Sequence, residues 1–327
     1  MSKLQLSINI LIILFLHFFK LNAQPVPAED ENISFLVTFG ANAPKAYGDD
    51  DHCQVFFFSI PATQVDPVYF RIFDPDTGGE NDELFDYFDT QTRFSLYGGK
   101  GAYSNEAAQN IDPVSGFKSG YLLDTKTFGV SAKYDNNWFT FGPFNPKEGE
   151  FIEELGGYVF KLIAEGISGN DGNLYTYYLS TEGNLNKRVE GGNAFTFEYT
   201  FRLYDNPKEV SHLYPYVDER VISIKQHNFD HDNDGLIRVI SVAKNGVLFK
   251  SSREGQWATS THEIYKEEHN TSLDIQFIKS QKQKKLNNNI VFYMTNQYGE
   301  SLPFYTIPIG GVPKFKYKIT VKRKGRN

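Results

Sequence analysis

The 327-residue sequence contains a single cysteine, Cys53, so no disulfide can form within the chain. Methionine and tryptophan are also scarce, with two residues of each. A fold without disulfides depends on its hydrophobic core or on bound metal for stability. We interpret Cys53 as a buried, unreactive thiol, because free cysteines are among the most buried residue types.

Common catalytic patterns are missing as well. The sequence has no Gly-x-Ser-x-Gly elbow, no His-Glu-x-x-His helix and no Cys-x-x-Cys pair. His227 and His231 have the spacing of a zinc site on a helix, but here they flank an acidic loop after a strand, where that spacing indicates less. We therefore expect a protein that is not an enzyme. Paired carboxylates of the kind that hydrolyse glycosides leave no pattern in a sequence.

The first residues have the features of a secretion signal. Residues 4–19 are mostly apolar and lie between Lys3 and Lys20. This run is short for a membrane span, and the small residue Ala23 offers a cleavage position, so residues 1–23 are predicted to be removed on export. No later apolar run is long enough for a transmembrane helix, and we expect none in the mature chain. Secretion, the periplasm and the cell surface remain open as destinations.

The mature chain is acidic. Removal of the signal takes away two lysines and no acid, which changes the net charge from −7 to −9. A general nucleic-acid-binding protein would show a basic footprint instead. We therefore expect no nucleic-acid partner, and the acidic balance is compatible with cation sites.

Aromatic residues are abundant, with 29 phenylalanines and 20 tyrosines, and Gly, Asn and Asp turns are frequent. Residues 195–203 alternate Phe, Phe, Tyr, Phe and Leu with polar residues, which predicts a strand with one buried and one wet face. Many such strands at short spacing indicate an all-β protein built from β-sandwiches of the jelly-roll or immunoglobulin-like kind.

The length suggests two domains. A turn at residues 205–208 is the predicted boundary. The expected order is a signal peptide, a flexible polar leader and two β-sandwich domains, which occupy residues 1–23, 24–32, 33–207 and 208–327.

Residues 230–235, Asp-His-Asp-Asn-Asp-Gly, place three carboxylates at alternate positions before a glycine. Calcium takes roughly six to eight oxygen ligands, and a glycine permits the tight turn. This stretch resembles the first half of the calcium loop of EF-hands, dockerins and thrombospondin type 3 repeats. Ser241 stands where an EF-hand has its bidentate acid, and the flanks are typical of strands. We predict a strand–loop–strand calcium site with Asp230, Asp232 and Asp234 as ligands; an ordinary Asp/Asn/Gly hairpin is the alternative.

A second acidic loop, residues 74–83, contains Asp74, Asp76 and Asp82 with two glycines, and Asp50 lies one strand earlier. If the two intervening strands pair as antiparallel neighbours, these acids meet at one end of the sheet. Clustered carboxylates repel one another unless a cation joins them. The sequence therefore predicts a second calcium site formed by Asp74, Asp76, Asp82 and Asp50, with a solvated acidic rim as the alternative.

Residues 314–322 alternate Phe, Tyr, Ile and Val with lysines. Lysines on an edge strand prevent sheet-to-sheet pairing, which is the interpretation we favour. The alternative is a basic face for an anionic surface or polysaccharide.

Three functions fit these features. The first is an exported, non-catalytic binding or adhesion protein, whose partner is an extracellular carbohydrate or protein and whose flat apolar surfaces include Trp138 or Trp257. The second is an extracellular hydrolase of a polysaccharide or other polymer that uses carboxylates of the acidic loops. The third is a structural component of a cell-surface assembly. An exposed aromatic platform, a cleft with two opposed carboxylates or a large self-complementary apolar patch would distinguish them.

Overall fold

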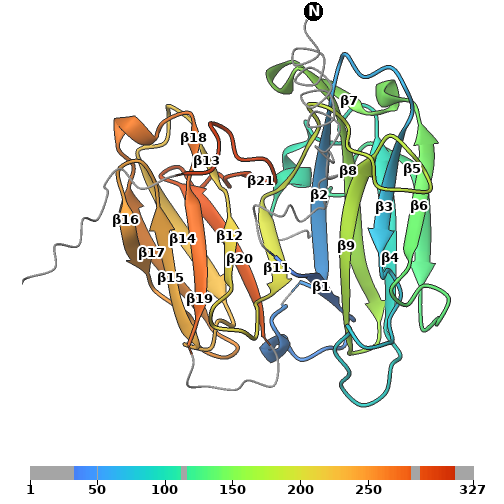
Figure 1. Cartoon of the computed structure of the whole chain (residues 1–327), viewed down its shortest axis with the longest axis horizontal. Helices are drawn as coiled ribbons and strands as arrows, with labels where there is room; N and C mark the ends of the chain where they lie inside the picture. The colour runs from blue at the N-terminus through green and yellow to red at the C-terminus, as the bar shows by residue number, and fades with distance from the viewer. Residues whose placement is uncertain (1–32, 50, 112–115, 281–287, 314–327) are drawn as a thin grey trace, which may run out of the picture.

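A computed structural model describes residues 33–49, 51–111, 116–280 and 288–313 (Figure 1). This part of the chain is nearly all β, with 48% strand and 6% helix, which confirms the all-β prediction. No helix among these residues is long and apolar enough to cross a membrane. The predicted signal, leader and basic terminal strand, and also Asp50, lie outside the described residues.

Three antiparallel sheets and one short ribbon make up the fold. The eight-stranded sheet has the order β17 (Trp257–Glu263), β14 (Ser223–Phe229), β20 (Asn289–Asn296), β11 (Glu198–Arg202), β1 (Leu36–Phe39), β9 (Gly172–Ser180), β3 (Val68–Phe73) and β6 (Trp138–Phe144). The seven-stranded sheet has the order β21 (Phe304–Tyr305), β10 (Asn193–Thr196), β2 (Cys53–Pro61), β8 (Gly157–Ser168), β4 (Gln91–Gly98) and β5 (Tyr121–Phe128), with β7 (Glu150–Ile152) beside β8.

The four-stranded sheet has the order β12 (Val210–Leu213), β19 (Asp274–Lys279), β15 (Gly235–Ile240) and β16 (Asn245–Phe249), and the ribbon pairs β13 (Tyr216–Val217) with β18 (Thr271–Ser272). The helical elements are single 3-10 turns: η1 (Lys45–Tyr47), η2 (Glu106–Gln109), η3 (Pro146–Glu148), η4 (Glu153–Leu155) and η5 (Lys266–Glu268).

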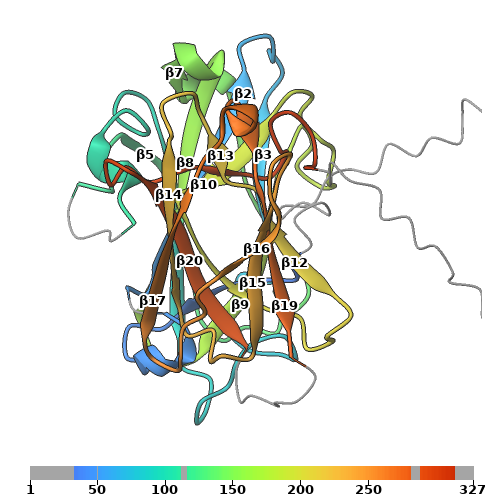
Figure 2. The same ribbon diagram turned by 90° about the vertical axis from the view of Figure 1, so that its left-hand side faces the viewer.

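The eight-stranded sheet is shared by both halves of the molecule. It runs from β17 in one half to β6 in the other (Figure 1), and the four-stranded sheet faces its β17 end (Figure 2). Aromatic pairs join the layers: Phe94 of the seven-stranded sheet lies 4.9 Å from Tyr175, and Phe277 of the four-stranded sheet lies 5.0 Å from Phe292, measured between ring centroids. Buried residues of all three sheets belong to one continuous hydrophobic core.

Strand pairing crosses the predicted boundary at residues 205–208. β20 pairs with β11, and β21 pairs with β10, so late strands extend sheets that begin in the first half. Both halves have the layered arrangement of a sandwich. Their division into two separate domains remains a prediction.

Two expectations about connections differ from the structure. The second calcium site was predicted on the condition that β2 and β3 pair, but they belong to different sheets. The strand expected at residues 195–203 is divided into β10 and β11, and the chain passes from one sheet to the other near Phe197.

The division of that strand has a visible physical reason. Its aromatic positions are all buried, but Phe195 and Phe197 pack in one hydrophobic cluster while Tyr199 and Phe201 pack in another. The opposite face was expected to be exposed to solvent, but it is only partly exposed. The Thr196 side chain is buried and donates hydrogen bonds to backbone carbonyl oxygens. Alternation therefore identified the buried positions but not the change of sheet.

Candidate metal centre

The candidate site forms where two loops leave paired strands. Phe73 of β3 is directly opposite Trp138 of β6, so the loop that leaves β3 and the loop that enters β6 begin side by side. The Asp74 N–H donates to Asn137 O at 3.0 Å and fixes this junction. Both loops lie at the lower end of the right-hand half of the molecule in Figure 1. Antiparallel pairing thus brings together residues that are about 60 positions apart in sequence.

Three carboxylates meet in this place. Asp74, Asp76 and Asp135 each offer one oxygen, and the three oxygens lie within 4.8 Å of one another. Among the described residues this is the one group of three or more acidic, histidine or cysteine side chains that is close enough to share a metal ion. Calcium–oxygen bonds are roughly 2.3–2.6 Å long, so two ligands on opposite sides of the ion are about 5 Å apart. The spacing fits calcium.

Burial differs among the three ligands. Asp74 is 1% exposed and Asp76 is 0% exposed, whereas Asp135 is half-buried. One oxygen of Asp74 accepts the Asn136 N–H and one oxygen of Asp76 accepts the Ser131 N–H, each at 3.0 Å. The other oxygen of Asp76, Oδ1, is buried and has no hydrogen-bond partner in the described chain. A buried anionic oxygen without a partner is costly, and a bound cation would remove that cost.

Two glycines allow the loops to approach each other. Gly78 and Gly79 have φ angles of 149° and 74°, a region that side-chain-bearing residues rarely adopt. A Cβ atom on Gly79 would lie 3.2 Å from Cγ of Asp135. The two glycines therefore leave room for the Asp135 carboxylate beside the loop.

The electrostatics of the cluster favour a cation. The pKa of Asp76 is raised to about 7, chiefly by burial and also by the neighbouring charges of Asp135 and Asp74, while the hydrogen bond from Ser131 opposes the increase. Burial also raises the pKa of Asp74, although the hydrogen bonds from Asn81 and Asn136 oppose that increase. Without a cation these carboxyl groups hold protons more strongly than usual, and a calcium ion would keep them ionised.

Asp82, which was predicted as a ligand of the second calcium site, lies outside the cluster of Asp74, Asp76 and Asp135. Its two oxygens accept backbone N–H groups, from Gly78 at 2.7 Å and from Leu174 at 2.6 Å. Burial raises the pKa of Asp82 to about 8, with further contributions from Asp74 and Asp76. Asp82 therefore connects the loop to β9 through hydrogen bonds. Asp135 is the third carboxylate of the cluster.

Sequence reasoning did not identify Asp135. It follows β5 in a connection to β6, far along the chain from Asp74. Its local signal is the run Asp135-Asn136-Asn137 directly before a strand, and Asn136 has a φ of 56°, a turn conformation that Asn tolerates. Correct pairing of β3 with β6 would have placed this run beside Asp74.

The loop at residues 230–235 does connect two strands, as predicted. However, β14 and β15 belong to different sheets, so it is not a hairpin. Asp230, Asp232 and Asp234 do not bring three oxygens within the distance found in the first cluster. The Asp230 side chain accepts the Gly255 N–H at 2.5 Å, and buried Asp234 lies 3.5 Å from the ammonium of Lys279.

That lysine, which is 8% exposed, supplies a positive charge where a metal ion was predicted. The turn conformation itself is strongly specified, because a Cβ on Gly235 would lie 2.0 Å from Ile278 O. Calcium binding by Asp230, Asp232 and Asp234 stays a prediction.

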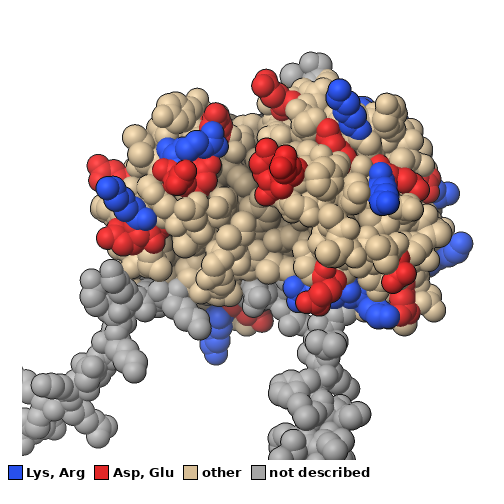
Figure 3. Space-filling view, turned by 90° about the horizontal axis from the view of Figure 1, so that it is seen from above, with Lys and Arg blue, Asp and Glu red and all other residues tan. Residues whose placement is uncertain are grey.

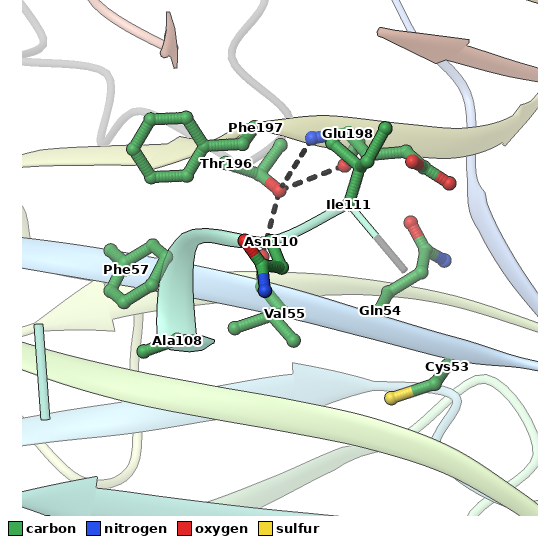
Figure 4. A pocket seen from close by; sticks show the side chains of 10 residues that line it. All are labelled: Cys53, Gln54, Val55, Phe57, Ala108, Asn110, Ile111, Thr196, Phe197 and Glu198. Atoms are coloured by element: carbon green, nitrogen blue, oxygen red, sulfur yellow. Dashed lines mark hydrogen bonds between the residues drawn. The ribbon is translucent and has the colours of Figure 1, made fainter. Parts of the chain in front are cut away.

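Two small cavities lie in the described chain. One of about 20 Å³ lies between β2, η2 and the β10–β11 junction and is lined by residues that include Cys53 and Glu198 (Figure 4). A second, lined by residues that include Leu179 and Thr306, is of similar size. Each has space for about one water molecule. Cys53 is half-buried rather than buried, and burial, with a contribution from Asp51, raises the pKa of its thiol well above the ordinary value.

Both tryptophans belong to ring clusters. Trp257 is 41% exposed on edge strand β17, with its ring 5.4 Å from Tyr293. Trp138 is half-buried, with the Arg71 guanidinium 4.8 Å from its ring and Phe73 at 5.4 Å. Seen from above, acidic and basic side chains are interspersed over the surface without a basic field (Figure 3).

The chain matches no protein-family model, and no curated protein matches it.

Proposed function

We propose that this protein is an exported binding protein without catalytic activity, and that a calcium ion held by Asp74, Asp76 and Asp135 stabilises its loops. The partner is an extracellular carbohydrate or protein. The export signal at residues 1–23 and the acidic balance of the mature chain support this proposal.

The observation that carries the proposal is the buried carboxylate cluster. Asp74 and Asp76 are almost fully buried, their partner Asp135 comes from a separate loop, and one Asp76 oxygen has no hydrogen-bond partner among the residues that the structure describes. Oxygen-only ligands at this spacing suit a hard cation such as calcium. An ion there would join the β3–β4 and β5–β6 loops and act in place of the disulfides that the chain lacks.

The two cavities do not supply the carboxylate pair that the alternative function, hydrolysis, requires. The cavity beside Cys53 includes one carboxylate, that of Glu198, and the cavity beside Leu179 includes none. Glycoside hydrolysis ordinarily uses two carboxyl groups on either side of a bound sugar. Neither cavity in the described part of the chain offers that arrangement.

The test is a thermal melt of the mature chain, residues 24–327, in millimolar calcium and then in chelator. An ion that binds only the folded state raises stability by about 2.7 kcal/mol at 100 times its dissociation constant. For a chain of this size we expect a shift of several degrees. Asp76→Asn should remove most of the shift, whereas Asp66→Asn, at an exposed acid away from the cluster, should keep it.

The same experiment separates the two acidic loops. If residues 230–235 also bind calcium, Asp232→Ala lowers the melting temperature in calcium more than in chelator; an equal loss in both shows that this loop is only a turn. If the unmodified chain melts at the same temperature in both buffers, the calcium proposal fails.

A further inference from the structure

The candidate metal centre has a closed side and an open side. Asp74 and Asp76 are buried beneath it, whereas Asp135 is half-buried and its neighbour Asn136 is exposed. Gly79, whose missing side chain leaves room for Asp135, is exposed too. An ion in this position is therefore held from the protein side and faces solvent on the other.

The charges of the cluster determine what can complete the coordination. Three carboxylates carry one more negative charge than calcium neutralises. Calcium takes roughly six to eight oxygens, so several positions remain after one oxygen from each carboxylate. A further anion would be repelled by the surplus negative charge and by exposed Glu80 nearby. Neutral oxygens are favoured, and hydroxyl oxygens have the added ability to donate hydrogen bonds to the carboxylates.

An apolar surface lies beside the open side. The point where a Cβ of Gly78 would stand is 3.7 Å from Oδ1 of Asp135 and 3.8 Å from Cγ1 of Val130, so these two atoms are at most 7.5 Å apart (3.7 + 3.8). Val130 is 60% exposed. An exposed apolar side chain next to a partly open ion suits a ligand that has both hydroxyl groups and C–H faces.

Aromatic rings lie at the ends of the two strands that carry the centre. Trp138 is the first residue of β6, three positions after Asp135, and it lies opposite Phe73. Its ring is fixed by Arg71, which is itself held by a hydrogen bond from its Nε to Thr140 Oγ1 at 3.3 Å. A ring held in this way loses little side-chain entropy on binding a ligand.

We infer that the open side of this centre binds a neutral sugar, with two adjacent ring hydroxyl groups as direct ligands of the calcium ion and the C–H face of the ring against Val130. This inference rests on the calcium ion of the proposed function and names its ligand class. Anionic polysaccharides are disfavoured by the charge of the cluster.

The test replaces calcium with terbium in the mature chain. Terbium luminescence lifetimes measured in H₂O and in D₂O count the water molecules on the ion, and the part of the signal absent from Asp76→Asn belongs to this centre. We expect about two or more waters. Methyl mannoside, which has adjacent hydroxyl groups, should displace two of them, whereas 1,3-propanediol at equal concentration should displace none.

Val130→Ser provides the matched variant, because the side chain is exposed and its loss leaves the core intact. It should weaken mannoside displacement roughly three- to tenfold and leave the water count unchanged. Methyl galactoside and methyl fucoside serve as additional neutral probes.

Each other outcome has a distinct meaning. An ion with no bound water, or bound waters that none of the three sugars displaces, overturns the inference and leaves the calcium proposal standing. Displacement that Val130→Ser does not alter overturns the assigned contact. Absence of terbium from this centre removes both proposals.

Discussion

In the absence of calcium, the protein should become less stable as the pH rises through neutrality. The relevant groups are Asp76, whose pKa burial raises to about 7, and Asp82, whose pKa burial raises to about 8, against an ordinary value of 3.8. Because both pKa values are higher in the folded state, the folded protein holds protons that the unfolded chain has released. Stability is therefore greatest at low pH for these two groups and is lost as the pH rises through 7 and 8.

Two histidines determine the lowest pH at which this loss of stability can be observed. Burial lowers the pKa of His227 from 6.5 to about 4, and it also lowers the pKa of His262. The unfolded chain binds protons at these histidines below pH 6.5, so they make stability rise with pH in that range and oppose the two carboxyl groups. Above pH 6.5 their effect fades over about one pH unit, and the carboxyl groups of Asp76 and Asp82 then dominate.

Between about pH 6.5 and 8 the folded state holds on average roughly one proton more than the unfolded state, which corresponds to a loss of about 2 kcal/mol. For a chain of this size, melting temperatures in chelator should then fall by about 3 °C over this range. Calcium should remove the part of the loss that belongs to Asp76, because a bound ion keeps that carboxylate ionised throughout the range, whereas Asp82 lies outside the cluster. The assay is a series of melts at constant ionic strength. A melting temperature that stays constant or rises with pH in chelator would refute the reasoning.

Other predictions concern the loops and the core. Asp171→Ala removes a buried carboxylate that accepts the backbone N–H groups of residues 85, 89 and 90, and we expect chemical denaturation to show a loss of about 2–4 kcal/mol. Glu268→Gln leaves the buried ammonium of Lys244 without its charged partner and should cost about 3–5 kcal/mol, while the double variant Lys244→Met/Glu268→Leu should recover most of that loss. The Cys53 thiol should react with a thiol reagent much more slowly in the folded protein than in denaturant, and equal rates would contradict its raised pKa.

Local sequence patterns predicted strands well. The odd positions from 195 to 203 are buried as expected. Periodicity reports which side chains face a core, because the side-chain direction alternates along any strand. Edge strand β5 was missed, since most of its residues are exposed and give no such pattern.

Strand partners were much harder to predict than strands. The turns after β2 and β8, residues 62–67 and 169–171, carry the chain to the opposite sheet, although turns of similar length also close hairpins. The sequence therefore did not show that β3 pairs with β6, and that pairing is what brings Asp135 to Asp74. Asp74 and Asp76 were predictable because both belong to one loop.

Polar contacts in the folded chain determine which of the remaining acidic residues are available to bind a metal ion. In the sequence, Asp76 and Asp82 look like equally good metal ligands of one acid-rich loop. The folded backbone distinguishes them, because the N–H groups of Gly78 and Leu174 donate to Asp82. In the same way, Lys279 lies far from residues 230–235 in sequence and reaches Asp234 only because β15 pairs with β19. Such partners depend on tertiary structure, and no spacing rule identifies them.

The most direct test of the account is a calorimetric titration of the metal-free mature chain with calcium at neutral pH, in parallel with Asp76→Asn. The account predicts saturable binding to the unmodified chain, together with loss in Asp76→Asn of the site that Asp74, Asp76 and Asp135 form. Equal calcium binding by the unmodified chain and by the variant, or no binding by either, would contradict it.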